Sequence, residues 1–157
     1  MRNHWFGPLV ASAILAAVTS GAAAAPPTAG EQAIEYRHSV YHVIAWNVGP
    51  MNEMIKGKIP YDPATFAKHA ARVAMMTPML LEGFPPDSNI AGKTHAKPGV
   101  WTDRATFENL LKKLETRSAT LADVAKGGDL AKVKPAFNDL LQACKDCHEK
   151  FREKDED

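Results

Sequence analysis

The sequence predicts an all-α protein, an antiparallel four-helix bundle. No stretch alternates polar and apolar residues with a period of two, whereas four segments repeat apolar residues every three or four positions. That spacing places the apolar side chains on one face of a helix. One connection between these segments is long and rich in proline and glycine. Four amphipathic helices with one long crossover connection form a known bundle topology.

The first predicted helix spans residues 31–56. Gly49–Pro50 lies within it, and we expect a bend or a loosened turn there because proline cannot donate a backbone hydrogen bond. The positions expected to face the bundle step by three and four, as in a heptad seam. They are Ile34, Arg37, Tyr41, Ile44, Val48, Met51 and Ile55.

The second predicted helix begins at Asp62, a good N-cap, followed by Pro63 at the first helical position. Pro78 is a second expected kink. Residues 83–100 then lack periodicity and form a loop. This loop is long for a compact domain, so we expect it to pack on something or to cover it. The core positions of the second helix are Phe66, Ala70, Val73, Thr77 and Leu80.

The third predicted helix opens at Thr102 or Asp103 and ends at Gly127–Gly128. Its expected inward positions are Phe107, Leu110, Leu114, Leu121 and Val124. Asp129 caps the fourth helix, and Pro135 should disturb its first turns. The inward stripe of this helix is Val133, Phe137, Leu140, Leu141, Cys144, Cys147, His148 and Phe151.

The fourth helix carries Cys-Lys-Asp-Cys-His at residues 144–148, with the only two cysteines of the chain. C-x-x-C-H is the attachment motif of a c-type haem, whose iron takes the histidine as an axial ligand. A zinc site would need four ligands, and no second cysteine pair exists. A thioredoxin-like pair would be expected among strands, and a disulfide would leave His148 unexplained. Cys144 and His148 are one helical turn apart with Cys147 beside them, so all three should face the bundle interior.

Residues 1–25 resemble a signal peptide, with an apolar stretch from Trp5 to Val18 and small residues at Ala22–Ala25. The stretch is too short for a membrane span, so we expect cleavage and no membrane insertion afterwards. Residues 26–157 would form one domain. Because c-type haem is attached outside the bacterial inner membrane, we expect a periplasmic protein.

The charges of the expected mature chain bear on its possible partners. Without Arg2 the chain has 18 basic and 18 acidic side chains. Such a balance gives no reason to expect nucleic acid or an anionic membrane surface as a partner.

Three segments together resemble the cytochrome c′ family of class II c-type cytochromes. They are Glu-Tyr-Arg-His-Ser at 35–39, Ala-Lys-Pro-Gly-Val-Trp at 96–101 and the haem motif with its continuation at 144–152. The resemblance covers essentially all of the expected mature chain. It implies one covalent haem c, thioether bonds at Cys144 and Cys147, and His148 as iron ligand. It further implies haem contacts from Arg37, His38 and His95, with Arg152 flanking the histidine; for His95 a plain surface role is the alternative.

The position opposite His148 distinguishes two functions within this family. Low-spin relatives have a methionine four residues after the first-helix arginine, and here that position is Tyr41. The heptad spacing independently places Tyr41 on the inward seam. We therefore expect five-coordinate, high-spin iron, with His38, His42 and Met51 as weaker rivals. A phenolate ligand from Tyr41 is disfavoured by the ordinary phenol pKa.

The resemblance predicts a periplasmic, redox-active haem protein that binds nitric oxide and carbon monoxide. The alternative is a low-spin electron-transfer cytochrome of the c-556 type that serves redox partner proteins. We expect no enzymatic activity, because no distal His/Arg pair lies on the turn of Tyr41. Class II cytochromes are usually homodimers, and Trp46 lies on an outward flank that would suit an interface. Alternatively, Trp46 packs against the long loop.

Overall fold

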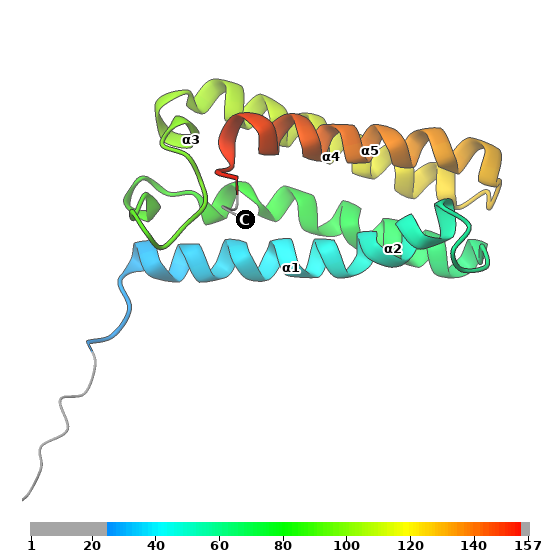
Figure 1. The fold of residues 1–157 in the computed structure, drawn as a ribbon, viewed down its shortest axis with the longest axis horizontal. Helices are drawn as coiled ribbons and strands as arrows, with labels where there is room; N and C mark the ends of the chain where they lie inside the picture. Colours follow the sequence, from blue (N-terminus) through cyan, green and yellow to red (C-terminus); the bar gives the residue numbers. More distant parts are fainter. Residues whose placement is uncertain (1–24, 155–157) are drawn as a thin grey trace, which may run out of the picture.

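The structure is a computed structural model that describes residues 25–154, so the expected signal peptide lies outside it except for Ala25. It confirms the four-helix bundle (Figure 1). The long helices are α1 (Ala29–Ile55), α2 (Pro63–Met76), α4 (Arg104–Ala125) and α5 (Leu130–Phe151). Between α2 and α4 lie the 3₁₀ turns η1 (Thr77–Met79), η2 (Leu81–Gly83) and η3 (Pro86–Ser88) and the short α3 (Gly99–Thr102). Within residues 25–154 no helix is long and apolar enough to span a membrane.

The helices pack in chain order, each antiparallel to the one before. α1 packs on α2, α2 on α4, and α4 on α5 (Figure 1). α1 and α5 lie opposite each other, and in the described part of the chain they have few direct contacts. The bundle is therefore open along one side, between its first and last helices.

The helix caps follow from local sequence. Thr28 forms a capping box with Glu31, so α1 begins at Ala29, two residues before the predicted start. The Asp62 carboxylate accepts a hydrogen bond of 2.7 Å from the Thr65 amide, and Asp129 accepts one of 2.9 Å from Ala131, which confirms both predicted caps.

The predicted seam of α1 faces the core, but at three positions a neighbouring residue is more deeply buried. Val40, Asn47 and Met54 are buried, whereas Tyr41, Val48 and Ile55 are only partly covered. Similarly, Leu111 and Ala125 of α4 are buried in place of the predicted Leu110 and Val124. The predicted residues still pack against the core, so the innermost stripe differs from the predicted one by a single residue and does not lie on another face of the helix. All five predicted core residues from Phe66 to Leu80 are buried, as expected.

Two of the three expected proline disruptions do not end a helix. α1 continues through Pro50 and α5 through Pro135. The carbonyl groups that lose a helical partner belong to Trp46 and Ala131, which are exposed residues, so water can satisfy them. Pro78 does mark a change, because α2 gives way to η1 at Thr77.

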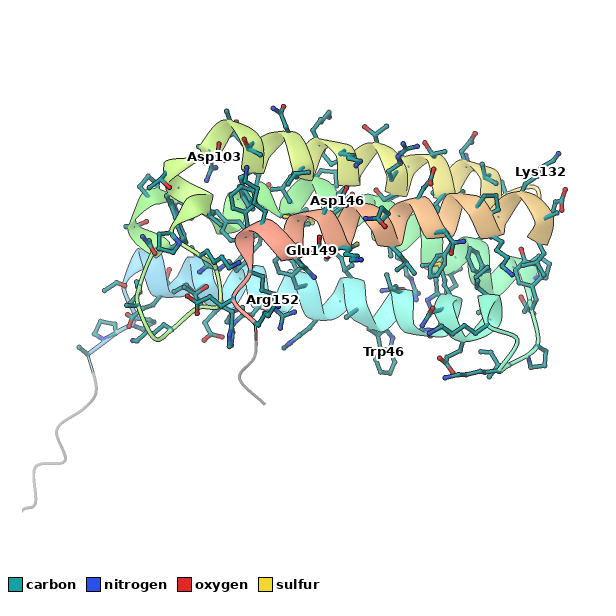
Figure 2. The ribbon with its side chains drawn as sticks, turned by 45° about the horizontal axis from the view of Figure 1, so that its top comes forward. Trp46, Asp103, Lys132, Asp146, Glu149 and Arg152 are labelled. Atoms are coloured by element: carbon teal, nitrogen blue, oxygen red, sulfur yellow. The ribbon has the colours of Figure 1, made fainter. Side chains whose placement is uncertain are left out.

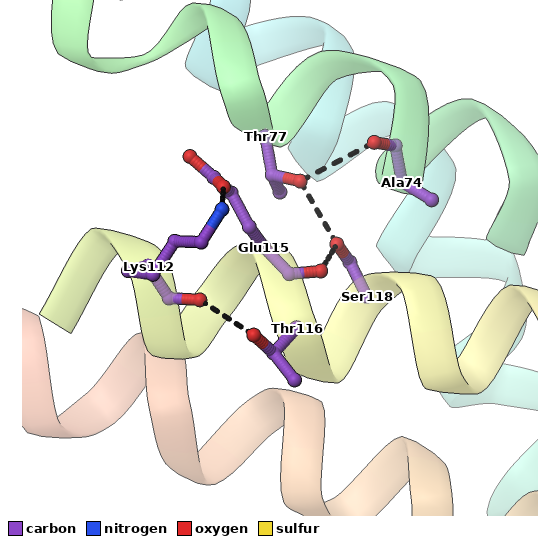
Figure 3. A network of polar contacts seen from close by, with 6 residues as sticks. All are labelled: Ala74, Thr77, Lys112, Glu115, Thr116 and Ser118. Atoms are coloured by element: carbon purple, nitrogen blue, oxygen red, sulfur yellow. Dashed lines mark hydrogen bonds and ion pairs between the residues drawn. The ribbon is translucent and has the colours of Figure 1, made fainter. Parts of the chain in front are cut away.

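A small hydroxyl network joins α4 to the end of α2 (Figure 3). Thr77 Oγ1 lies 2.8 Å from Ser118 Oγ, and Ser118 donates to the Glu115 carbonyl at 2.8 Å. Both side chains are almost fully buried. They can be buried at this helix contact because each hydroxyl has a partner.

The crossover connection approaches α1 so closely that only glycine fits at Gly83. A Cβ atom on Gly83 would lie 2.5 Å from Cβ of Arg37, whereas one on Gly49 would have no atom within 4 Å beyond its chain neighbours and its own helix backbone. The first contact is between atoms close to two backbones, so relief requires the crossover to move away from α1.

We expect Gly83→Ala to lower the free energy of unfolding by about 1–3 kcal/mol, the usual cost of overpacking. The control is Gly49→Ala on the exposed face of α1, which should change stability by less than about 0.5 kcal/mol, because a Cβ there meets no other part of the fold and only adjoins the ring of Pro50. Urea unfolding of both haem-loaded variants measures the two effects. A Gly83→Ala variant as stable as the wild type would show that the crossover is not held against α1.

Candidate functional site

A cavity of about 620 Å³ lies between α1 and α5, in the open side of the bundle. Part of its wall is apolar and includes side chains of α4 and the aromatic residue Phe84 of the crossover. The main apolar side chains are Ile44, Val48, Phe84, Val100, Phe107, Leu111, Leu114, Leu141 and Phe151. Its volume is in the range of binding sites for sizeable organic groups.

The structure brings the three residues of the haem motif to this cavity. Cys144, Cys147 and His148 all line it from the last two turns of α5, and neither cysteine is in a disulfide. Burial, followed by the neighbouring Cys144, raises the pKa of the Cys147 thiol to about 11. Burial, followed by the positive charge of Arg152, lowers the pKa of His148. His148 is thereby kept in the neutral form that ligates metals.

Apart from the two thiols, Tyr41 and Thr94, the polar side chains at the cavity are basic. Besides His148 they include Arg37, His38, His42, His95 and Arg152, and none of the lining residues is acidic. Two thiols, an imidazole, apolar walls and a basic rim match the parts of a haem c, which has vinyl groups, an iron atom, a flat apolar ring and two carboxylates. These residues therefore fit the predicted prosthetic group.

Arg37 has a second role that the sequence did not reveal. Its side chain is only 1% exposed, and Nη1 donates to the Gly83 carbonyl at 2.8 Å and to Ser88 Oγ at 2.9 Å. Nη2 donates to Thr94 Oγ1 at 2.6 Å and to the Ser88 carbonyl at 3.3 Å. The guanidinium carbon also lies 4.7 Å from the ring centre of Phe84. Arg37 thus fastens the crossover to α1 where it borders the cavity, and its predicted haem contact stays a prediction.

Tyr41 lines the cavity from α1, on the wall opposite the motif. Burial, followed by the nearby thiols of Cys147 and Cys144, raises the pKa of its phenol well above the usual value. The group is therefore a neutral phenol at physiological pH and not a phenolate. Of the weaker rivals, His38 and His42 also line the cavity, whereas Met51 is fully buried in the core and does not.

A further contact at the cavity was not predicted. Just before α3, the crossover pairs with the end of α5 through an isolated antiparallel bridge between Ala96 and Arg152. The Lys97 amide donates to the Phe151 carbonyl at 2.9 Å, and the Glu153 amide donates to the His95 carbonyl at 2.8 Å. These bonds use backbone groups, so side-chain patterns in the sequence carry no signal for them. They place His95 and Arg152 next to each other in the fold.

Trp46 lies away from this site. It projects from α1 into solvent (Figure 2) and is 76% exposed, so the alternative that it packs on the long loop is wrong. Val43, one turn earlier on α1, is also exposed.

Comparisons with known proteins agree with this geometry. The family model described as cytochrome C′ matches residues 32–152. Cytochrome c′ of Rubrivivax gelatinosus is 38% identical over 122 residues, which cover 78% of this chain and 95% of that protein. The structure of cytochrome c′ from Shewanella frigidimarina is similar with a TM-score of 0.77 and 36% identity, covering 80% of this chain and 97% of that one.

Two of the similar solved structures contain gas ligands. They are variants of cytochrome c′ from Alcaligenes xylosoxidans, one as a nitric oxide complex and one with bound carbon monoxide. Each has a TM-score of 0.74 and 30% identity, and each comparison covers 80% of this chain and 97% of that one.

Proposed function

The chain belongs to the cytochrome c′ family, and from that premise we propose that it is a periplasmic protein that binds nitric oxide and carbon monoxide without turning them over. The family carries a covalent haem c. The observation that carries the proposal is the cavity between α1 and α5, where Tyr41 faces the haem motif and no methionine is among the lining residues. The gas complexes of the relatives from Alcaligenes xylosoxidans support it.

Each part of the cavity has a role in this proposal. When bound, haem c supplies an iron atom that can bind a diatomic gas and change its oxidation state. Cys144 and Cys147 would hold the ring by thioether bonds, and neutral His148 would be the axial ligand. Arg152, which is exposed at the end of α5, would attract one of the two carboxylates, and the buried cation of Arg37 would add positive charge near the other. The apolar side chains of α4 exclude water from the ring.

Tyr41 controls access from the α1 side. Its ring lies in the cavity wall, and its neutral phenol does not supply the negative charge that a tyrosine ligand to iron requires. The side chain therefore acts as a steric barrier that an incoming gas must displace. Such a barrier slows small ligands and excludes larger ones.

The absorption spectrum of the ferrous haem-loaded protein tests the proposed function. We expect a five-coordinate, high-spin spectrum that changes when carbon monoxide is added, because no side chain would block the open position permanently. A low-spin spectrum that carbon monoxide leaves unchanged would contradict the proposal. It would favour the electron-transfer alternative of the c-556 type, with His38 or His42 from the cavity wall as the sixth ligand.

Substitution of Tyr41 tests the steric role separately. Tyr41→Ala removes the ring, and we expect the association rate of carbon monoxide, measured by stopped flow, to rise at least tenfold, which corresponds to about 1.4 kcal/mol. Tyr41→Phe is the matched control, because it keeps the ring and removes only the hydroxyl, and its rate should stay near that of the wild type. Equal rates in Tyr41→Ala and wild type would mean that the ring is no barrier.

We also propose that the protein is a homodimer whose interface includes the exposed face of α1. Trp46 and Val43 present a large apolar surface there, one turn apart. A tryptophan left in water is costly, and exposed apolar groups of this size mark interaction surfaces.

Trp46→Glu should therefore convert the dimer to a monomer, because it places a charge in the apolar centre of the interface. Sedimentation velocity measures the mass. Leu130→Glu is the control, since Leu130 is also an exposed apolar residue but lies at the start of α5. A monomeric wild type, or a Trp46→Glu variant that stays dimeric, would refute this interface.

A further inference from the structure

The two walls that carry Tyr41 and His148 are not held together by direct packing. α1 and α5 face each other across the cavity and, in residues 25–154, they have few contacts (Figure 1). Within the bundle, α1 and α5 are connected through the two other long helices, since α1 packs on α2, α2 on α4 and α4 on α5. Within residues 25–154 the crossover provides another connection, because it contacts both α1 and the end of α5. We call residues 83–97 the strap.

On one side the strap is bound to α1 by the buried Arg37. The guanidinium donates to Gly83, Ser88 and Thr94, all within the strap. A charge that is 1% exposed is stable only if its N–H groups find acceptors, and here the strap provides them. The strap therefore cannot leave α1 without stranding a charge in an apolar surrounding.

On the other side the strap binds the last turn of α5, which begins at His148. The carbonyl groups at the end of a helix lack partners within the helix. The Phe151 carbonyl accepts from the Lys97 amide at 2.9 Å, and the Glu149 carbonyl accepts from Lys97 Nζ at 3.2 Å. The strap thus fixes the turn that carries the expected iron ligand, and Figure 2 shows Arg152 and Glu149 at this end of α5.

Thr94 links the contact of the strap with α1 to its contact with α5. Its Oγ1 accepts a hydrogen bond of 2.6 Å from Arg37 Nη2 and another of 3.1 Å from the amide of Ala96. Ala96 is the strap residue that pairs with Arg152. One oxygen atom therefore joins the buried cation on α1 to the backbone pairing that holds the end of α5.

We infer that Thr94 is a positioning residue, which sets the orientation of His148 relative to the α1 wall by coupling Arg37 to the bridge between Ala96 and Arg152. The inference rests on the proposed function, because it assigns this threonine a role toward the axial ligand of that site. Valine at this position would keep the shape and remove the acceptor. The buried Nη2 and the Ala96 amide would both lose a partner, and the pairing with α5 would loosen.

Hydrogen–deuterium exchange of the haem-loaded protein tests the coupling. We expect Thr94→Val to speed exchange at least tenfold in the segments around the Lys97 and Glu153 amides, while the core of α4 stays as in the wild type. Thr94→Ser should restore slow exchange. Thr116→Val is the control, because Thr116 is an exposed threonine that bonds only within α4, at 2.9 Å to Lys112. Unchanged exchange in Thr94→Val, or equal acceleration throughout the bundle, would overturn the inference.

A second measurement separates positioning from stability. The iron–histidine stretching band of the ferrous protein, measured by resonance Raman, should shift or broaden in Thr94→Val and return in Thr94→Ser. Faster exchange in Thr94→Val with an unchanged band would overturn the positioning role. Failure of the proposed function is recognised differently, by a six-coordinate spectrum in the wild type, and the exchange result does not depend on it.

Discussion

The buried guanidinium of Arg37 is the interaction on which the architecture of the site depends. Four of its N–H bonds hold the crossover against α1, and the ring of Phe84 covers its face. A single desolvated cation thus organises a connection that has little regular structure of its own. Burying this charge is costly unless its N–H groups are bonded. Few other paths of the crossover backbone would bring that many acceptors to one point, so the buried charge favours the observed path over alternatives.

Much of the fold could be predicted because its causes are local. The caps at Asp62 and Asp129 depend on one side chain and one nearby amide, and the core of α2 follows a clear period. The innermost stripe of α1 was harder to predict, since Val48 is as apolar as Val40, yet only Val40 is fully buried. Which of two neighbouring residues turns inward depends on the neighbouring helices, and the sequence of α1 alone does not contain that information.

One part of the candidate site could likewise be predicted from local sequence, and another part could not. Cys144, Cys147 and His148 could be predicted because they are adjacent in sequence, and a helix places them on one face. The contacts of Gly83, Ser88 and Thr94 with Arg37 could not, because they join residues more than forty positions apart. Their acceptors include backbone carbonyls, which every residue possesses. The pairing of Ala96 with Arg152 is likewise independent of side-chain identity.

The cavity also has a thermodynamic consequence. Apolar side chains of α1, α4 and α5 that line this cavity have no packing partner on one side within residues 25–154. Apolar area left in contact with water forgoes about 25 cal/mol of stabilisation for each Å². The porphyrin ring is then the missing central layer of the hydrophobic core as well as the reactive group. Haem attachment and completion of the core are then a single event, in which the chain gains its final packing from a group that becomes covalently bound to it.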